Sequence, residues 1–183
     1  LGFIVSLGKM SKHWFFRWPM DIYINFFRGT PLFVQILIIH FGVIKLVLGH
    51  TDAIIAAITA LTLNSAAYSA EIYRAGIQSI DRGQTEAALS LGMSRFQTMR
   101  FIILPQAVKR MIPPFGNEFI VLVKDSSLVS IIAAPEIMYW AGSMQGQYLR
   151  IWEPYLTAAF IYLVLTYSLS KLLNYVERRL NRA

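Results

Sequence analysis

Acidic and polar side chains interrupt the apolar stretches of this 183-residue chain. An ionisable or amide group inside an apolar segment is energetically costly, and it usually faces a cavity or a partner group. Such groups are therefore the first candidates for chemistry or for contact with a ligand. They fall in three separate stretches, and the residues selected are Asn64, Ser65, Tyr68, Glu118, Asp125 and Glu153.

Catalysis by these groups would require two of them in close contact. Glu118 and Asp125 are seven residues apart, which places them on one helix face but about 10 Å from each other at the helical rise per residue. The chain has no cysteine for a thiolate metal site, and its three histidines are far apart in sequence. It also lacks a phosphate-binding glycine loop, since Gly8-Lys9 is followed by Met10. We expect no catalytic residue, metal site or cofactor site on this chain.

The elements that carry the polar groups are apolar enough to cross a membrane. Hydrophobic residues make up 56% of the chain and charged residues 15%, with a mean hydropathy of +0.50. A spanning helix needs about 20 mostly apolar residues, and backbone groups in lipid must pair within the segment. The sequence predicts an all-α integral membrane protein forming one domain over residues 1–183. The expected spans are 31–48, 53–73, 111–134 and 152–173, after the end of a truncated helix at 1–10.

Basic residues give the orientation of these spans. If the segment before residue 31 is cytoplasmic, 14 of the 17 basic residues, Arg182 among them, fall on the inner side. The positive-inside rule predicts this asymmetry and a cytoplasmic C-terminus. Because topology accounts for the basic residues, no basic face remains for nucleic acid, and we expect no nucleic-acid partner.

The third predicted span appears in the sequence as a broken helix. Pro113, Pro114 and Gly116 interrupt its start, and residues 124–127 split its apolar run. Transporters often bind substrate where a helix is broken near the midplane of the membrane. We expect a path around residues 118–127, faced by residues 64–68, with the acid at position 153 near the outer mouth.

Each path residue also has a purely structural interpretation. Asn64 continues a stripe of small residues with Ala56 and Ala60, a pattern that serves helix packing. Asp125 can be neutralised by its neighbour Lys124. An acid at position 153 can simply favour the positive end of its helix. The sequence leaves both interpretations open.

The longest polar loop, residues 78–110, predicts two short helices. Asp81 followed three residues later by Gln84 is close to a capping box, which marks a helix start. Both helices are expected to stop at a glycine or a proline, and their ranges are 85–91 before Gly92 and 94–103 before Pro105.

The same loop contains a spaced motif. Glu86-Ala87-Ala88 is followed after three residues by Gly92, and after nine more by Ile102, one residue and Leu104-Pro105. This pattern resembles the cytoplasmic loop signature of permease subunits of ATP-binding-cassette (ABC) importers. In physical terms, two alanines allow close approach by another surface, the acid offers a charge to a partner, and the glycine permits a sharp turn.

Other segments resemble the polar amino-acid uptake family of these permeases, the importers for histidine, glutamine, arginine and related compounds. The segments that carry the resemblance are Arg28-Gly29-Thr30-Pro31-Leu32, Asn64-Ser65-Ala66-Ala67-Tyr68, residues 71–78, 116–120 and 177–180. The resemblance implies a type I importer bundle (MetI-like) with about four complete transmembrane helices here. It also implies a coupling helix that docks on an ATPase subunit through Glu86, Ala87, Ala88, Gly92 and Arg95.

Several partners follow from the same resemblance. They are ABC ATPase subunits that carry Mg-ATP, a second permease subunit, an extracytoplasmic solute-binding protein, an amino-acid substrate and the lipid of a bacterial inner membrane. ATP hydrolysis is then expected on a separate chain. A different class remains possible at this stage: a non-transporting membrane sensor or scaffold that uses the loop to bind a cytoplasmic partner.

Overall fold

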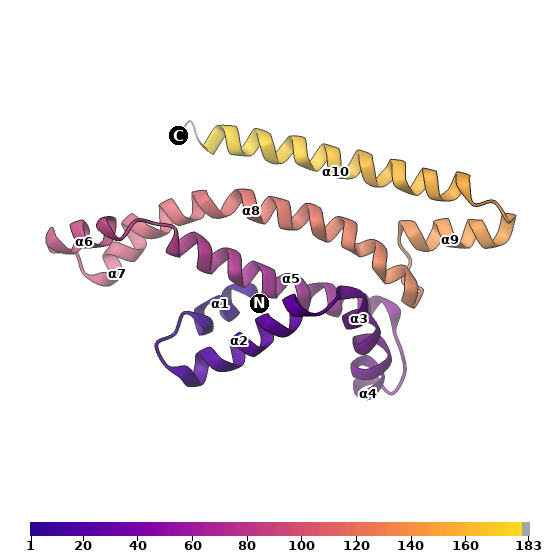
Figure 1. Ribbon diagram of the computed structural model, residues 1–183, viewed down its shortest axis with the longest axis horizontal. Helices are drawn as coiled ribbons and strands as arrows, with labels where there is room; N and C mark the ends of the chain where they lie inside the picture. The colour runs from indigo at the N-terminus through magenta and orange to yellow at the C-terminus, as the bar shows by residue number, and fades with distance from the viewer. Residues whose placement is uncertain (181–183) are drawn as a thin grey trace.

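The computed structural model describes residues 1–180, and every regular element in that part of the chain is helical. Arg182, counted above among the inner basic residues, lies outside the described residues. Three long helices run side by side along the molecule (Figure 1): α5 (Ala53–Gln78), α8 (Leu104–Asp125) and α10 (Trp152–Leu180). The predicted all-α class is confirmed.

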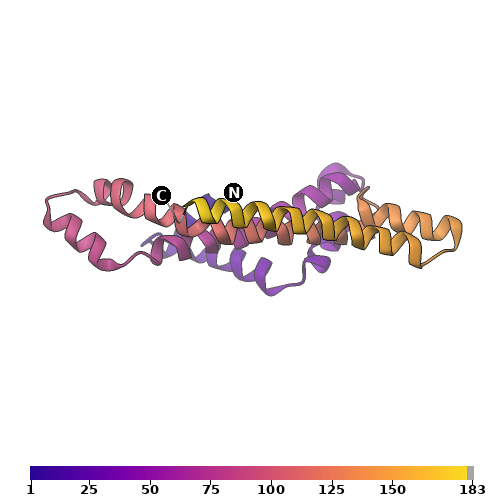
Figure 2. The same ribbon diagram turned by 90° about the horizontal axis from the view of Figure 1, so that it is seen from above.

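Short helices lie at the two opposite ends of the long ones. Helices α6 (Arg82–Ser90) and α7 (Arg95–Gln97) form one end, and α9 (Ile137–Tyr148) lies with the start of α10 at the other end. The view from above shows the same separation (Figure 2). Helix α9 was not among the elements expected from the sequence.

Helices α1 (Gly2–Lys9) and α2 (Trp14–Gly29) pack against one side of α5. The chain then bends by 109° into a helical run from Leu32 to Leu48, made of α3 (Leu32–Leu37), the π-helical segment η1 (Ile38–Ile44) and α4 (Lys45–Leu48). The predicted span 31–48 is therefore one arm of a bent pair.

By length and composition, α5 and α10 qualify as membrane spans among residues 1–180, and the bent pair makes a third if it is counted as one span. These criteria identify fewer spans than the four expected. Helix α8 does not meet them, because it begins in the polar loop and carries basic residues in its first half.

Small residues explain why α5 can sit at the centre of the bundle. Its buried positions are almost all alanines, with Gly76 near its end. A side chain on Gly76 would collide with Met111 of α8, and one on Gly2 of α1 would collide with Ser69 of α5. Small residues of this kind let helices approach closely where lipid provides no hydrophobic drive.

The expected break at Pro113 and Pro114 is wrong, because α8 is continuous through both prolines. A proline frees the carbonyl four residues before it, and here those carbonyls belong to Lys109 and Arg110, whose side chains are exposed. Gly116 is a packing position, since a side chain there would collide with Leu173 of α10.

The expected split at residues 124–127 is confirmed. Helix α8 ends at Asp125 and continues as the 3₁₀ segment η3 (Ser126–Ile132). The second loop helix does not end before Pro105: π-helical turns (η2, Thr98–Ile103) join α7 directly to α8. Pro105 is the second residue of α8 and lies directly after the π-helical turns.

Candidate functional site

The loop motif forms the short helix predicted for it. Asp81 caps the start of α6 by accepting a hydrogen bond of 2.6 Å from the backbone N–H of Gly83. The helix stops at Gly92, whose φ of +82° suits glycine. The N–H of Gly92 donates to the Leu89 carbonyl and that of Met93 to the Ala88 carbonyl, a Schellman arrangement.

The motif residues divide into one buried and four exposed positions. Ala88 packs inward, while Glu86, Ala87, Gly92 and Arg95 are exposed. Apolar side chains beside them are exposed as well: Leu89, Leu91 and Phe96, of which Leu91 is 84% exposed. We call Glu86, Ala87, Leu91, Arg95 and Phe96 the loop surface. An exposed apolar surface with a polar rim is typical of a protein-binding site.

The loop is held firmly to the long helices. Helix α6 packs against η2, which continues into α8. A core cluster of Ile80, Ile103, Ala107 and Met111 joins the ends of α5 and α8 beneath it. Arg110 of α8 also donates a short hydrogen bond to the Ser79 carbonyl at the end of α5. The loop is thus in contact with α8 through η2 and with the end of α5 through the shared cluster.

A cavity of about 530 Å³ lies next to this end of the bundle, between α2, α5 and α8. Two of the six predicted path residues line it together, Tyr68 from α5 and Glu118 from α8. Three arginines, which the path prediction did not include, line it as well: Arg28, Arg74 and Arg110.

Glu71 is the centre of an ion-pair network on the wall of this cavity. Its carboxylate lies 2.8 Å from the Lys9 ammonium, 2.7 Å from the Arg74 guanidinium and 3.5 Å from the Arg28 guanidinium. Lys9 also contacts Asp21 at 3.4 Å. The network joins α1, α2 and α5, and the Glu71 side chain is only 16% exposed.

The other four predicted path residues do not line this cavity, although Ser65 and Asp125 lie close enough to Glu118 to interact with its carboxyl group. Asn64 is buried at the bend between α2 and α3, where its amide donates to Gln35 Oε1 at 2.9 Å. Ser65 lines a separate groove of about 360 Å³ that reaches α1. Asp125 ends α8, and its neighbour Lys124 lines a further cavity with Tyr162.

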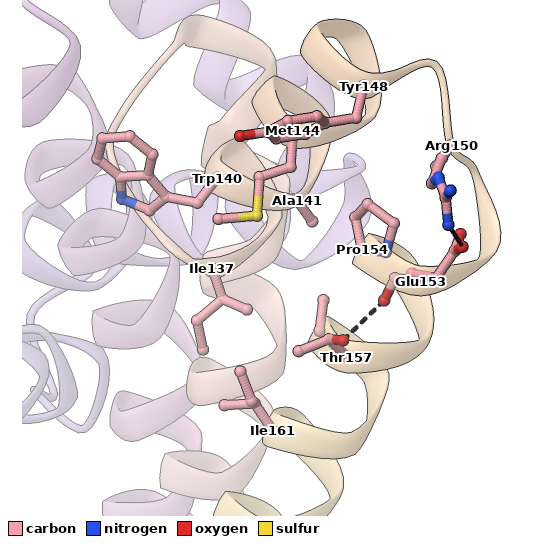
Figure 3. Close-up of a pocket in the computed structure, with 11 residues that line it drawn as sticks. Ile137, Trp140, Ala141, Met144, Tyr148, Arg150, Glu153, Pro154, Thr157 and Ile161 are labelled. Atoms are coloured by element: carbon pink, nitrogen blue, oxygen red, sulfur yellow. Dashed lines mark hydrogen bonds and ion pairs between the residues drawn. The ribbon is translucent and has the colours of Figure 1, made fainter.

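Glu153 lies at the opposite end of the molecule, in the first turn of α10. It lines a cavity of about 440 Å³ between α9 and α10, which Trp140 and Met144 make largely apolar (Figure 3). Its carboxylate pairs with Arg150 at 2.8 Å, and both side chains are mostly exposed. The cavity that contains this acid does not contain Glu118.

Sequence reasoning missed the basic residues of the central cavity because it used them as topology signals and as parts of motifs, and not as residues of the path. The spacing of Glu71 and Arg74 did offer a signal, since residues three apart meet on a helix surface. No spacing rule connects Arg28 to Glu71, because they belong to different helices.

Comparison with known proteins identifies relatives of this chain. The profile of the family described as "Binding-protein-dependent transport system inner membrane component" matches residues 1–182. The arginine transport system permease protein ArtQ of Bacillus subtilis is 44% identical over 183 residues, covering 98% of this chain and 82% of the relative. The glutamine transport system permease protein GlnP of Escherichia coli is 35% identical and covers 98% of this chain and 83% of its own length.

Solved structures of ABC transporters also resemble this chain in fold. The crystal structure of an amino acid ABC transporter with histidines contains a chain with 45% identity and a TM-score of 0.92, covering 97% of this chain and 83% of that one. A MetNI methionine ABC transporter in an inward-facing conformation matches with a TM-score of 0.78 at 20% identity, covering 98% and 87%, and so shares the fold.

The fold is thus that of the permeases of type I ABC importers. The chain belongs to the family of inner-membrane components of binding-protein-dependent transport systems. It is a permease subunit, and the alternative of a non-transporting scaffold finds no support in these comparisons.

Proposed function

We propose that this protein is the membrane-spanning subunit of an ATP-driven importer of amino acids. The observation that carries the proposal is the exposed loop surface on and beside α6, which a core cluster joins to the two long helices that line a charged cavity. Relatives named for arginine and glutamine transport support the substrate class.

The loop surface is proposed to dock on a separate ABC ATPase. Exposed Leu91 and Phe96 supply apolar contact, and Glu86 and Arg95 supply charges at the rim. When two ATPases close on ATP, they move α6, and the shared cluster beneath the loop transmits that movement to α5 and α8. ATP thereby shifts the balance between an inward-open and an outward-open bundle. Mg-ATP is bound and hydrolysed by the partner, and this chain acts by changing shape.

The proposed translocation path passes through the central cavity, with Tyr68 and Glu118 in contact with the substrate. Ser65 and Asp125 remain candidates for other stages of the path, and Glu153 for its outer mouth. The Asn64 amide donates a hydrogen bond to Gln35 at the bend, which favours a structural role for Asn64. The positive-inside asymmetry supports an inner membrane location with the C-terminus in the cytoplasm.

A second permease subunit and an external binding protein complete the proposed assembly. Helix α10 is strongly apolar, yet Ala158 is its one buried residue. Its exposed apolar length favours contact with lipid or with a partner subunit. The second subunit is either an identical or a related chain.

Uptake into proteoliposomes tests this function. The complex of this chain with its ATPase is reconstituted, the binding protein and labelled L-arginine, L-glutamine or L-histidine are supplied outside, and ATP is enclosed. We expect ATP-dependent accumulation of at least one of the three. Co-purification of the ATPase without any accumulation would contradict transport and restore the scaffold alternative.

A further inference from the structure

The turn that joins α1 to α2 combines cations with aromatic rings, and the permease mechanism above gives it no role. Residues 1–20 contain three cations and no acidic residue. In the structure the turn points toward the same end of the molecule as the loop helices α6 and α7 (Figure 1). We give the name α1–α2 patch to its five exposed members, which are Lys12, Trp14, Phe15, Arg17 and Trp18.

The aromatic rings of the patch begin an apolar stripe that runs along α2. Phe15 and Trp18 are 68% and 61% exposed, and Ile22 and Phe26 are still 48% and 47% exposed. These four residues are three or four positions apart, so they share one face of the helix. The opposite face packs on α1 and α5, where Ile24 is buried. One apolar face of α2 is therefore left uncovered by the rest of residues 1–180.

The side chains of this face follow the order of a membrane leaflet. Phe26 and Ile22 lie nearest the bend at the end of α2, Trp18 comes next, and Lys12 lies at the turn. A leaflet offers hydrocarbon first, then the interface where tryptophan is enriched, and then the charged headgroups. An ATPase bound at the end of the bundle would cover the turn alone, whereas the exposed face extends along the helix.

The charges of the patch are only partly compensated. Lys12 makes no ion pair among residues 1–180. Arg17 is 62% exposed and lies 3.7 Å from the Asp21 carboxylate, which also contacts Lys9 at 3.4 Å. In addition, no side chain caps the start of α2 at His13, and an uncapped helix start favours an anion. The patch thus suits a negatively charged partner with an apolar body.

A second copy of this chain does not meet that description. Two identical patches facing each other would bring their cations together, and like charges across an interface repel. An anionic phospholipid does meet it, because acyl chains cover the apolar face and the phosphate group approaches the cations.

We propose that the α1–α2 patch binds anionic phospholipid of the cytoplasmic leaflet. Lys12 and Arg17 contact the phosphate groups, and Trp14 and Trp18 lie at the level of the headgroups. This inference rests on the proposed orientation, in which the turn lies on the inner side of the membrane, and it is independent of the transported solute. It goes beyond general contact with lipid, because it names a lipid charge and the residues that select it.

Fluorescence quenching by brominated lipid tests the lipid site. The chain has no cysteine, so Ser11→Cys takes a single bimane label before the complex with the ATPase is assembled. The labelled complex is reconstituted into vesicles of phosphatidylcholine and phosphatidylglycerol, in which either one lipid or the other carries bromine on its acyl chains. The ratio of the two quenching curves measures how strongly phosphatidylglycerol is enriched beside the turn.

The labelled parent should enrich phosphatidylglycerol roughly 5- to 20-fold over phosphatidylcholine, as expected for two cations near an anionic surface. In Lys12→Gln/Arg17→Gln the enrichment should fall to less than about twofold. Both side chains are exposed, so this variant should insert and assemble normally. Lys12→Arg/Arg17→Lys keeps both charges and should keep the enrichment.

Lys171→Gln/Arg178→Gln is the matched control. It also removes one lysine and one arginine, from exposed positions in the second half of α10. Its enrichment beside the turn should equal that of the labelled parent. Equal losses in the two neutralised variants would mean that total charge alone attracts the lipid, and the site would be overturned.

Two further results would also overturn the lipid site. One is equal quenching by both lipids in the labelled parent. The other is loss of quenching by either lipid once the ATPase is bound, which would show that a protein covers the patch. The proposed function is tested separately: enrichment without uptake of any of the three amino acids would contradict the importer alone, and uptake without enrichment would contradict the lipid site alone.

Discussion

The loop surface and the central cavity differ in what they leave exposed: apolar side chains at the loop, and few unpaired charges in the cavity. The loop surface is a short local element that leaves apolar side chains such as Leu91 and Phe96 exposed. The cavity is built from helices distant in sequence, and its charged groups are mostly paired inside the protein. The comparison teaches that the proposed docking surface stays uncovered in the isolated chain, whereas most charges of the cavity are compensated within it.

The largest expected effect is that of Gly92→Asp in the loop. A side chain at φ +82° is strained, and the new acid lies at the negative end of helix α6. Insertion should remain intact, while uptake and transport-linked stimulation of the ATPase are lost. Nothing lies within 4 Å of the added Cβ, so the loss cannot come from a clash inside this chain.

Gly92→Asn provides the control for that experiment. Asparagine and aspartate tolerate the left-handed conformation about equally, so this variant carries the same backbone strain without the charge, and it should retain most of the uptake. Stimulation that persists in Gly92→Asp would show that the loop does not couple to the ATPase.

A second effect concerns the exposed apolar part of the loop surface. Leu91→Gln should weaken association with the ATPase about tenfold, since apolar anchors dominate such interfaces. The measurement is the affinity of the purified permease for the ATPase. Leu149→Gln is a matched control, because Leu149 is also 84% exposed but lies next to α9 at the opposite end. Equal losses in both variants would remove the special role of the loop surface.

The cavity network should respond through stability as well as through transport. Glu71→Gln leaves Lys9, Arg28 and Arg74 close together without their shared carboxylate. The Tm of the detergent-purified protein should fall by roughly 3 °C, as expected for a loss of about 1 kcal/mol in a chain of this length. An unchanged Tm would mean that the network contributes nothing to the packing of α1, α2 and α5.

The smallest effect is expected at the outer end. Glu153→Gln removes an exposed ion pair with Arg150, and such pairs contribute little. Uptake should change by less than about twofold in kcat/KM, and Tm should stay constant. Uptake by Asp125→Asn, measured in the same experiment, tests whether the end of α8 belongs to the path. A strong loss of uptake in Glu153→Gln would move the critical part of the path to the cavity between α9 and α10.

The sequence was most informative where the signal is local. The start of α6 at Asp81, its end at Gly92 and the split after Asp125 all depend on neighbouring residues, and the structure confirms them. The expected break at Pro113 and Pro114 was wrong, because the helix tolerates proline where the freed carbonyls belong to exposed residues.

The candidate site was predictable only in part. Tyr68 and Glu118 line one cavity as expected, yet Glu153 lies at the other end of the molecule. Arg28 entered the sequence argument as part of a motif, and its place on the cavity wall depends on a bend that Gln35 and Asn64 hold.

By itself, the sequence determined the apolar helical class and the helix that forms part of the loop surface, and it predicted which helix ends face the cytoplasm. These features follow from composition, charge order and capping residues, which act over a few neighbouring positions. The tertiary structure alone decided that Lys9, Arg28 and Arg74 meet around Glu71, and that Arg28 and Arg74 line a cavity together with Glu118. That arrangement depends on how small residues of α5 let α1, α2 and α8 approach, and no local pattern records the distance between helices.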